Sequence, residues 1–292
     1  MPFIPHTEAD TESMLKAIQA DSIETLYDEI PATISPQEST AAGTSLDEIA
    51  LTRLMQNHEP DNKNTRCFLG AGSYQHHIPA AVWDIVGRGE YYTAYTPYQA
   101  EASQGSLQTI FEYQQMMTEL MQMDLSNASL YDGATALAEA ALMSVRITRG
   151  KKTKIAVPET LHPAYRDVLT TLLSAQGITL HTIAHQNGLI DPNNFSDNIH
   201  DCAAVILAQP NFFGVLDDMD ALTTLAHQNN VLVIACVNPR AMALLKPPGL
   251  WGEQGADIVC GEGQPLGVPV MSGGPYFGFM CCRKLFARQL PG

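Results

Sequence analysis

Positive charge is scarce in this 292-residue chain, which has 16 Lys and Arg against 31 Asp and Glu and a formal net charge of −15. Proteins that bind nucleic acids present basic surfaces to the phosphate backbone, so this balance argues against such a partner. The sequence also has no run of eighteen apolar residues, the length that a membrane-spanning helix needs. We therefore expect neither a nucleic-acid partner nor a membrane partner.

Paired-cysteine and metal-binding spacings are missing as well. The six cysteines show no C-x-x-C pattern, and the adjacent His76 and His77 have no companions at ligand intervals, so we expect no metal. The opening residues "MPFIPHTEAD" have neither a basic region nor an apolar region of a signal peptide. These features predict a reducing, cytoplasmic setting.

The pattern of polar and apolar residues changes near residue 65 and divides the sequence into two parts. Residues 1–64 read as a helical N-terminal extension, with apolar residues at helical spacing around Met14 and a second helix that we expect Ser45 to cap. Residues 65–292 read as one large domain. In it, residues 105–123 form a long helix whose apolar stripe, including Leu107 and Phe111, we assign to the core.

Strands and helices then alternate along the chain. Continuous apolar strands are predicted in the segments "TKIAVP", "ITLHTIA", "AAVILAQ", "VLVIACV" and "ADIVCG", with helices such as "HPAYRDVLTTLLSAQG" between them. Unbroken apolar strands separated by helices are typical of a parallel sheet that is covered on both faces. The expected fold is therefore a three-layer α/β domain that follows a helical extension.

Ligands of such sheets bind at the carboxyl ends of the strands, beside helix N-termini. Two places in the sequence fit this rule. In "LYDGATALAEA", Asp132 or Thr135 can cap a helix, and Gly133 allows close approach of an anion; an ordinary capped helix explains the motif equally well. His162 precedes a helix that starts at Pro163, although a lone histidine is more often structural.

Two further stretches are candidates for binding. The segment "AYTPYQAEASQG" is rich in polar and aromatic groups, which favours a binding role for Tyr95, Tyr98, Gln99 and Glu101. The segment 261–278 holds six glycines and no lysine, and it matches neither the dinucleotide fingerprint nor a P-loop.

Five blocks of the sequence, in the right order, resemble the glycine decarboxylase P-protein, and in particular the first (α) chain of its two-subunit bacterial form. They are "YYTAYTPYQAEASQG", "LYDGATALAEAA", "HPAYR", "LLKPPG" and "GADIVCGEGQPLGVPVMSGGPYFG". The resemblance implies the fold of pyridoxal-phosphate-dependent transferases (fold type I). It also implies decarboxylation of glycine and transfer of the aminomethyl group to the lipoyl arm of the H-protein.

The cofactor-binding half of that family carries a Schiff-base lysine in an N-L-H-K-T-F block and an Asp that holds the pyridine nitrogen. By this resemblance the His-Lys pair falls on Gln264 and Pro265, and the Asp falls on Ala235, with Asn238 retained. Proline has no amine and alanine has no charge, so neither cofactor role is available. The resemblance therefore implies that this chain has no catalytic residue of its own and that subunit 2 binds pyridoxal phosphate covalently in an α2β2 assembly.

Chains of this kind usually continue into a smaller C-terminal domain, so we expect that domain to be missing after "QLPG". Two alternatives stay open. One is a catalytically inactive scaffold or regulatory paralogue of a pyridoxal-phosphate enzyme. The other, against which the absent lysine argues, is a self-sufficient enzyme such as an aminotransferase.

Overall fold

A computed structural model describes residues 6–31, 33, 45–58, 68, 70–92, 96–270 and 275–291. Contacts divide the chain into two units, Met1–Arg66 and Cys67–Gly292. Each unit is taken by itself below. Within the described part of the chain, no helix has the length and apolar character that crossing a membrane requires.

The described part of the first unit is helical. It contains α1 (Glu8–Ala17), a 3-10 turn at Glu24–Tyr27 and α2 (Glu48–His58). Thr7 and Asp10 form a capping box at the start of α1, in which each side chain bonds the backbone N–H of the other. At α2 the expected cap was wrong, because Asp47 rather than Ser45 accepts the hydrogen bond from the N–H of Ala50, at 2.7 Å.

The second unit is built on a mixed seven-stranded sheet with the order β1-β9-β8-β7-β6-β2-β3. The five strands that the sequence predicted are all present and pair in parallel with one another: β2 (Lys154–Pro158), β3 (Thr179–Ile183), β6 (Cys202–Gln209), β7 (Leu232–Val237) and β8 (Ile258–Glu262). Two strands of this sheet were not predicted. β9 (Gly278–Cys282) runs antiparallel to β8, and β1 (Leu125–Ser126) pairs antiparallel with β9.

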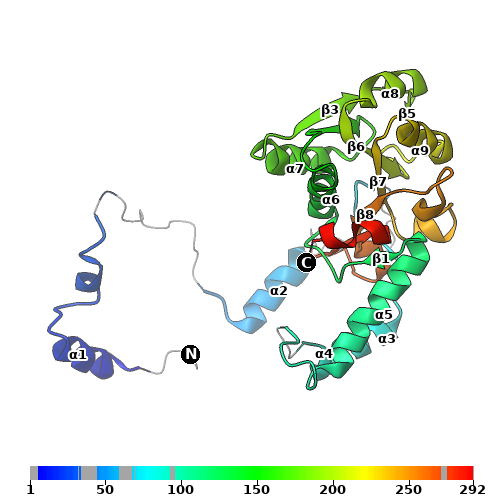
Figure 1. Cartoon of the computed structure of the whole chain (residues 1–292). Coiled ribbons are helices and arrows are strands. Elements are labelled where there is room, and N and C mark those ends of the chain that lie inside the picture. Colours follow the sequence, from blue (N-terminus) through cyan, green and yellow to red (C-terminus); the bar gives the residue numbers. More distant parts are fainter. Residues whose placement is uncertain are drawn as a thin grey trace. The chain divides into compact units, whose positions relative to one another are not determined.

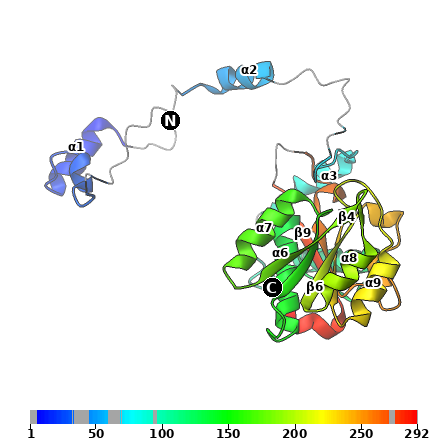
Figure 2. The same cartoon turned by 90° about the horizontal axis from the view of Figure 1, so that it is seen from above.

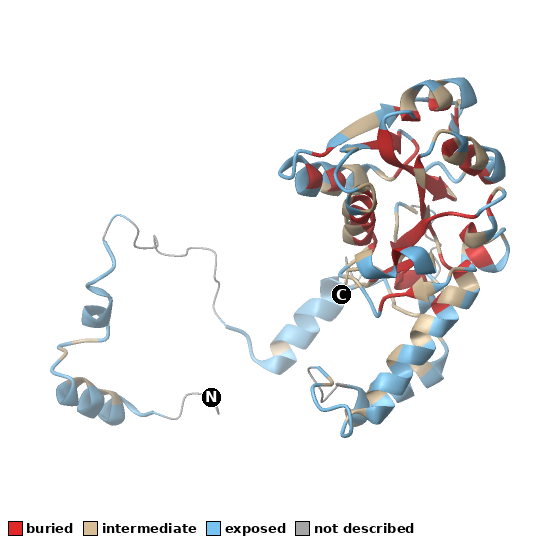
Figure 3. Ribbon diagram, in the orientation of Figure 1, coloured by how far each residue is buried: buried red, intermediate tan, exposed pale blue. Residues whose placement is uncertain are grey.

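Helices cover both faces of this sheet, which gives the three layers (Figures 1 and 2). One face packs against α6 (Gly133–Ile147) and α7 (Pro163–Ser174). The other packs against α5 (Gln104–Met121), α8 (Pro192–Ile199) and α9 (Met219–Gln228). Most of the strands form the buried centre between these helices, and β3 at the edge of the sheet is only partly buried (Figure 3). The short elements of this unit are α3 (Ala80–Val86), α4 (Gly89–Tyr92), the hairpin β4–β5 (His185–Gln186 and Leu189–Ile190) and 3-10 turns at Ala241–Ala243, Pro248–Leu250, Gln264–Leu266 and Lys284–Gln289.

Close packing of α6 follows from its alanines. Ala136, Ala138, Ala140 and Ala141 are completely buried, and their small side chains let the helix lie near the strands. The core assignment for α5 holds for Met117 and Met121 but is wrong for Leu107 and Phe111, which are 38% and 61% exposed. The reason is that the first half of α5 extends beyond the sheet (Figure 1).

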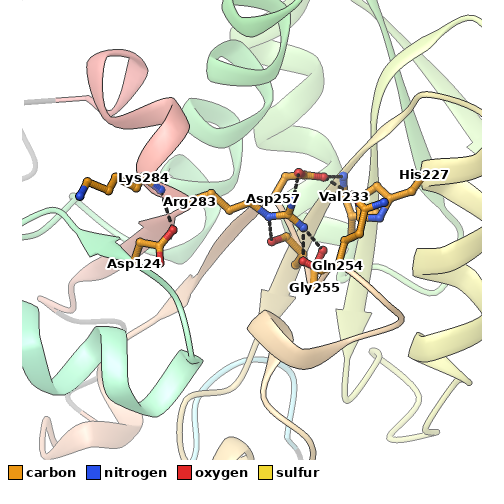
Figure 4. Close-up of polar contacts among 9 residues, drawn as sticks. Asp124, His227, Val233, Gln254, Gly255, Asp257, Arg283 and Lys284 are labelled. Atoms are coloured by element: carbon orange, nitrogen blue, oxygen red, sulfur yellow. Dashed lines mark hydrogen bonds and ion pairs between the residues drawn. The ribbon is translucent and has the colours of Figure 1, made fainter.

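A buried carboxylate ties several of these elements together (Figure 4). Asp257 is 3% exposed and lies just before β8. It accepts hydrogen bonds of 2.9 Å from the ring of His227, on α9, and from the backbone N–H of Val233, on β7. Its other oxygen lies 3.4 Å from the guanidinium of Arg283, which follows β9. The charge is therefore paired inside the protein, as a buried carboxylate requires.

Candidate functional site

A cleft opens at the carboxyl edge of the parallel strands, where a sheet of this kind places its ligands. Its walls come from the ends of β6, β7 and β8, from the start of α7 and from a segment that precedes α3. The volume of the cleft is about 80 Å³. Its lining consists of Gly72, Tyr74, Leu161, His162, Tyr165, Ala208, Pro210, Asn211, Phe212, Cys236, Val237, Asn238, Gly261, Glu262 and Pro265.

His162 forms one wall of this cleft and is the N-cap of α7. Its Nδ1 accepts a hydrogen bond from the N–H of Ala164 at 3.1 Å, and its Nε2 bonds the carbonyl oxygen of Ala71 at 2.9 Å. The ring stacks on Tyr165 with centroids 5.2 Å apart and meets the edge of Phe212 at 4.8 Å. Both ring nitrogens are therefore occupied by backbone groups, and the ring is held in the wall of the cleft.

The floor of the cleft meets the N-terminus of α6. Asp132 caps this helix, and its Oδ1 accepts a hydrogen bond from the N–H of Thr135 at 2.7 Å. Thr135 completes the capping box, so both candidates for the cap take part in it. The N–H of Gly133 donates to the carboxylate of Glu262 at 2.9 Å, across 129 residues of sequence. Two acidic side chains of the chain itself thus hold the first turn of α6.

Burial shapes the electrostatics of this floor. It raises the pKa of Glu262, while hydrogen bonds from the backbone of Gly133 and of Gln264 act in the opposite direction. Burial also raises the pKa of the Tyr165 hydroxyl well above its usual value, with Cys236 and Glu262 as further causes. The phenol therefore stays neutral and cannot supply a base at ordinary pH.

The two positions that the resemblance assigned to cofactor chemistry hold no reactive group. Pro265 lines the cleft. Ala235 is completely buried in β7, in the core on the α8 and α9 side of the sheet. Gln264 is 1% exposed, and its amide bonds the backbone of Tyr74 in both directions and the carbonyl of Val268. Gln264 therefore joins two loops and is not part of the cleft lining.

Of the remaining candidates, Asn238 lines the cleft, and its side-chain oxygen accepts from the N–H of Arg240 at 3.0 Å. The structure does not bring Tyr98, Gln99 and Glu101 into the cleft: all three are exposed, and Gln99 bonds Glu101 at 3.1 Å. Tyr95 lies outside the described residues.

The cleft residues that sequence reasoning did not single out include Gly72, Tyr74, Tyr165 and Glu262. Gly72 has a φ of +98°, and a Cβ on it would lie 3.2 Å from Nε2 of His162. The glycines of "GAG" at 70–72 signalled this close approach. Nothing in the local sequence signalled that Glu262 reaches α6.

Comparison with solved structures defines the class of this fold. A crystal structure entitled glycine decarboxylase (P-protein) of the glycine cleavage system, in inhibitor-bound form, matches with a TM-score of 0.81 at 40% identity and covers all of this chain and 65% of that chain. The Lactobacillus brevis glutamate decarboxylase matches with a TM-score of 0.65 at 12% identity, over 88% of this chain and 62% of that one, which shows the fold alone. The fold is that of the pyridoxal-phosphate-dependent enzymes of fold type I, as the sequence predicted.

The particular family follows from the sequence matches. A family model described as the glycine cleavage system P-protein matches residues 1–292, and the chain belongs to this family. A relative from Coxiella burnetii is 60% identical over 295 residues and is named "Probable glycine dehydrogenase (decarboxylating) subunit 1". A relative of the same name from Thioalkalivibrio sulfidiphilus is 54% identical. This chain is covered completely in both matches, and it spans 65% and 66% of the lengths of these relatives.

Pyridoxal phosphate serves the enzymes of this fold, but the cleft of this chain does not fit it. Among the described residues that line the cleft there is no lysine to bind the aldehyde and no cation to pair with the phosphate. The helix N-terminus that would meet an anion is already in contact with Glu262.

Proposed function

We propose that this chain is the subunit of glycine decarboxylase that does not bind pyridoxal phosphate. In this proposal the assembled enzyme, the P-protein of the glycine cleavage system, decarboxylates glycine and transfers the aminomethyl group to the lipoyl group of the H-protein. Membership of the P-protein family over residues 1–292 supports the proposal. So does the shared name of relatives that are 52–60% identical to the chain.

The observation that supports a cofactor site on the other subunit is the absence of a cation among the described residues that line the cleft. Pro265 lines it where the family's reactive lysine would stand, and Ala235 cannot supply a carboxylate to the pyridine nitrogen. We therefore assign the covalent cofactor site to a second subunit, in an α2β2 assembly that acts in the cytoplasm. This chain would then complete the structure around the partner's cofactor, and His162 and Asn238 would hold the shape of its own cleft.

A first experiment tests the cofactor assignment. The purified chain is mixed with pyridoxal phosphate and treated with borohydride, and the labelled peptides are identified by mass spectrometry. We expect no stoichiometric label on the chain, whereas subunit 2 under the same conditions is labelled at one lysine. One specifically labelled lysine in this chain, with the visible absorbance of a bound cofactor, would overturn the assignment.

A second experiment tests the activity. The chain is co-expressed with a subunit 2 of the same family, and the purified material is assayed for complex formation and for exchange of the glycine carboxyl group with bicarbonate. We expect a complex of two copies of each chain that exchanges bicarbonate, and no exchange by this chain alone. A stable pair without exchange, or no pair at all, would favour the inactive scaffold instead.

A further inference from the structure

The contact between Glu262 and α6 joins two parts of the fold that are far apart in the sequence. Glu262 is the last residue of β8, and its Oε2 accepts the N–H of Gly133, the first residue of α6, at 2.9 Å. Its Oε1 accepts the N–H of Gln264 at 3.1 Å. One carboxylate therefore uses both oxygens on backbone donors, as a bound oxyanion does.

The approach of the two backbones leaves no room at this point for a side chain on Gly133. A Cβ there would lie 2.3 Å from the hydroxyl of Tyr165 and 2.8 Å from the backbone nitrogen of Glu262. Glu262 is thus held against the helix end by its own main chain and not only by its flexible side chain. The carboxylate is a fixed part of the cleft floor.

The charges around the start of α6 also disfavour a second anion there. Asp132 caps the same helix, so two carboxylates already neutralise the partial positive charge of its first turn. Among the described residues that line the cleft, Glu262 is the one charged side chain, and it is negative. While Glu262 is in place, a phosphate group at this position would meet its like charge.

We infer that Glu262 is an internal anion that occupies the anion site at the N-terminus of α6 and closes this cleft to phosphate-bearing ligands. The Glu262 side chain supplies the negative charge and the hydrogen-bond acceptors that a ligand's phosphate would supply at an open helix N-terminus. Removal of the carboxylate should therefore create a phosphate site that the wild-type chain does not have. This property belongs to the chain alone, so its test does not depend on the proposed activity or on a partner.

The test compares the full chain with its Glu262→Ala variant, using inorganic phosphate as the probe. Unfolding temperatures are measured in phosphate and in sodium chloride of equal ionic strength, and binding is followed by phosphorus NMR. We expect the wild type to unfold at the same temperature in both salts. For a dissociation constant of about 1 mM, 10 mM phosphate should raise the unfolding temperature of Glu262→Ala by roughly 3 to 6 °C.

Two further variants separate the causes. Glu262→Gln keeps the shape of the side chain, so it should lose stability yet show no phosphate response, and a response equal to that of Glu262→Ala would overturn occupancy by the side chain. Glu159→Ala removes an exposed carboxylate near the end of β2 and should behave as the wild type does. Saturable phosphate binding by the wild type, or a folded Glu262→Ala without it, would also overturn the inference. If Glu262→Ala does not fold in chloride, its refolding yield in phosphate gives the same answer.

Discussion

Replacement of Asp257 by Asn removes one buried negative charge and leaves the shape of the side chain almost unchanged. Asp257 is 3% exposed and receives the ring N–H of His227 and the backbone N–H of Val233, both at 2.9 Å (Figure 4). Its second oxygen faces Arg283 at 3.4 Å. In Asp257→Asn one oxygen still serves Val233, but the new NH₂ group must point at another donor.

The size of the effect follows from these partners. Removal of one member of a buried ion pair costs about 3–5 kcal/mol. Arg283 keeps other acceptors, because its guanidinium also donates to the carbonyl oxygens of Gln254, Gly255 and Ala256. Its side chain is 22% exposed, so water screens part of the lost interaction. We therefore expect Asp257→Asn to lower the free energy of unfolding by about 3 kcal/mol, or the unfolding temperature by roughly 6–12 °C.

Urea unfolding of the full chain, followed by circular dichroism and tryptophan fluorescence, measures this change. The slope of free energy against urea should stay the same, since the exposed surface on unfolding does not change. Asp201→Asn is the matched control, because Asp201 pairs with Lys154 at 3.9 Å while its side chain is 85% exposed. We expect the control to lose at most about 0.5 kcal/mol. An Asp257→Asn protein as stable as the control would refute the reasoning.

Three other changes are expected. Gly133→Ala should lower the free energy of unfolding in urea by more than about 2 kcal/mol, because its Cβ would lie 2.8 Å from a backbone nitrogen. Gly105 lies on a helix with open space around it, so Gly105→Ala should leave the free energy of unfolding unchanged or raise it by about 0.5 kcal/mol. Equal effects of the two substitutions would contradict this account. Burial raises the pKa of Asp217, so its contribution to stability is largest at pH values below the ordinary aspartate pKa of about 3.9 and is lost as the pH rises. The stability advantage of the wild type over Asp217→Asn should therefore shrink as the pH rises from this value, and an advantage that grows would be incompatible with it. Burial raises the pKa of Cys281 to about 12 and that of Cys282 to about 11. At pH 8, mass spectrometry should therefore find both thiols unmodified by iodoacetamide in the native chain and modified in urea. Rapid labelling of the native chain would count against their burial.

Much of the fold could be predicted from local sequence alone. The strands β2, β6, β7 and β8 are largely buried, so each one stands out as an apolar run between helices, whereas β3 lies at the edge of the sheet and buries only Ile183. β9 is just as buried, but its residues "GFMCC" directly follow a glycine-rich segment and were not assigned to a strand. The two-residue strand β1 is too short to show any period.

The candidate site was predicted less completely. His162 and Gly133 were proposed because strand ends and helix starts are visible in the sequence, and those places meet at one edge of a parallel sheet, whereas Asn238 was proposed through the resemblance. The loop with Tyr98 was chosen for its composition alone, and the structure leaves that residue 82% exposed. Composition reports which groups a loop carries but not the direction in which it faces.

By itself the sequence determined which chemistry this chain lacks: Pro265 has no amine and Ala235 has no charge, whatever surrounds them. Only the tertiary structure decided what takes the place of a ligand in the cleft. Glu262 and Gly133 are 129 residues apart, and they meet because β8 ends beside the start of α6. Such a contact depends on how the helix packs against the sheet, and the local spacing of residues carries no record of that packing.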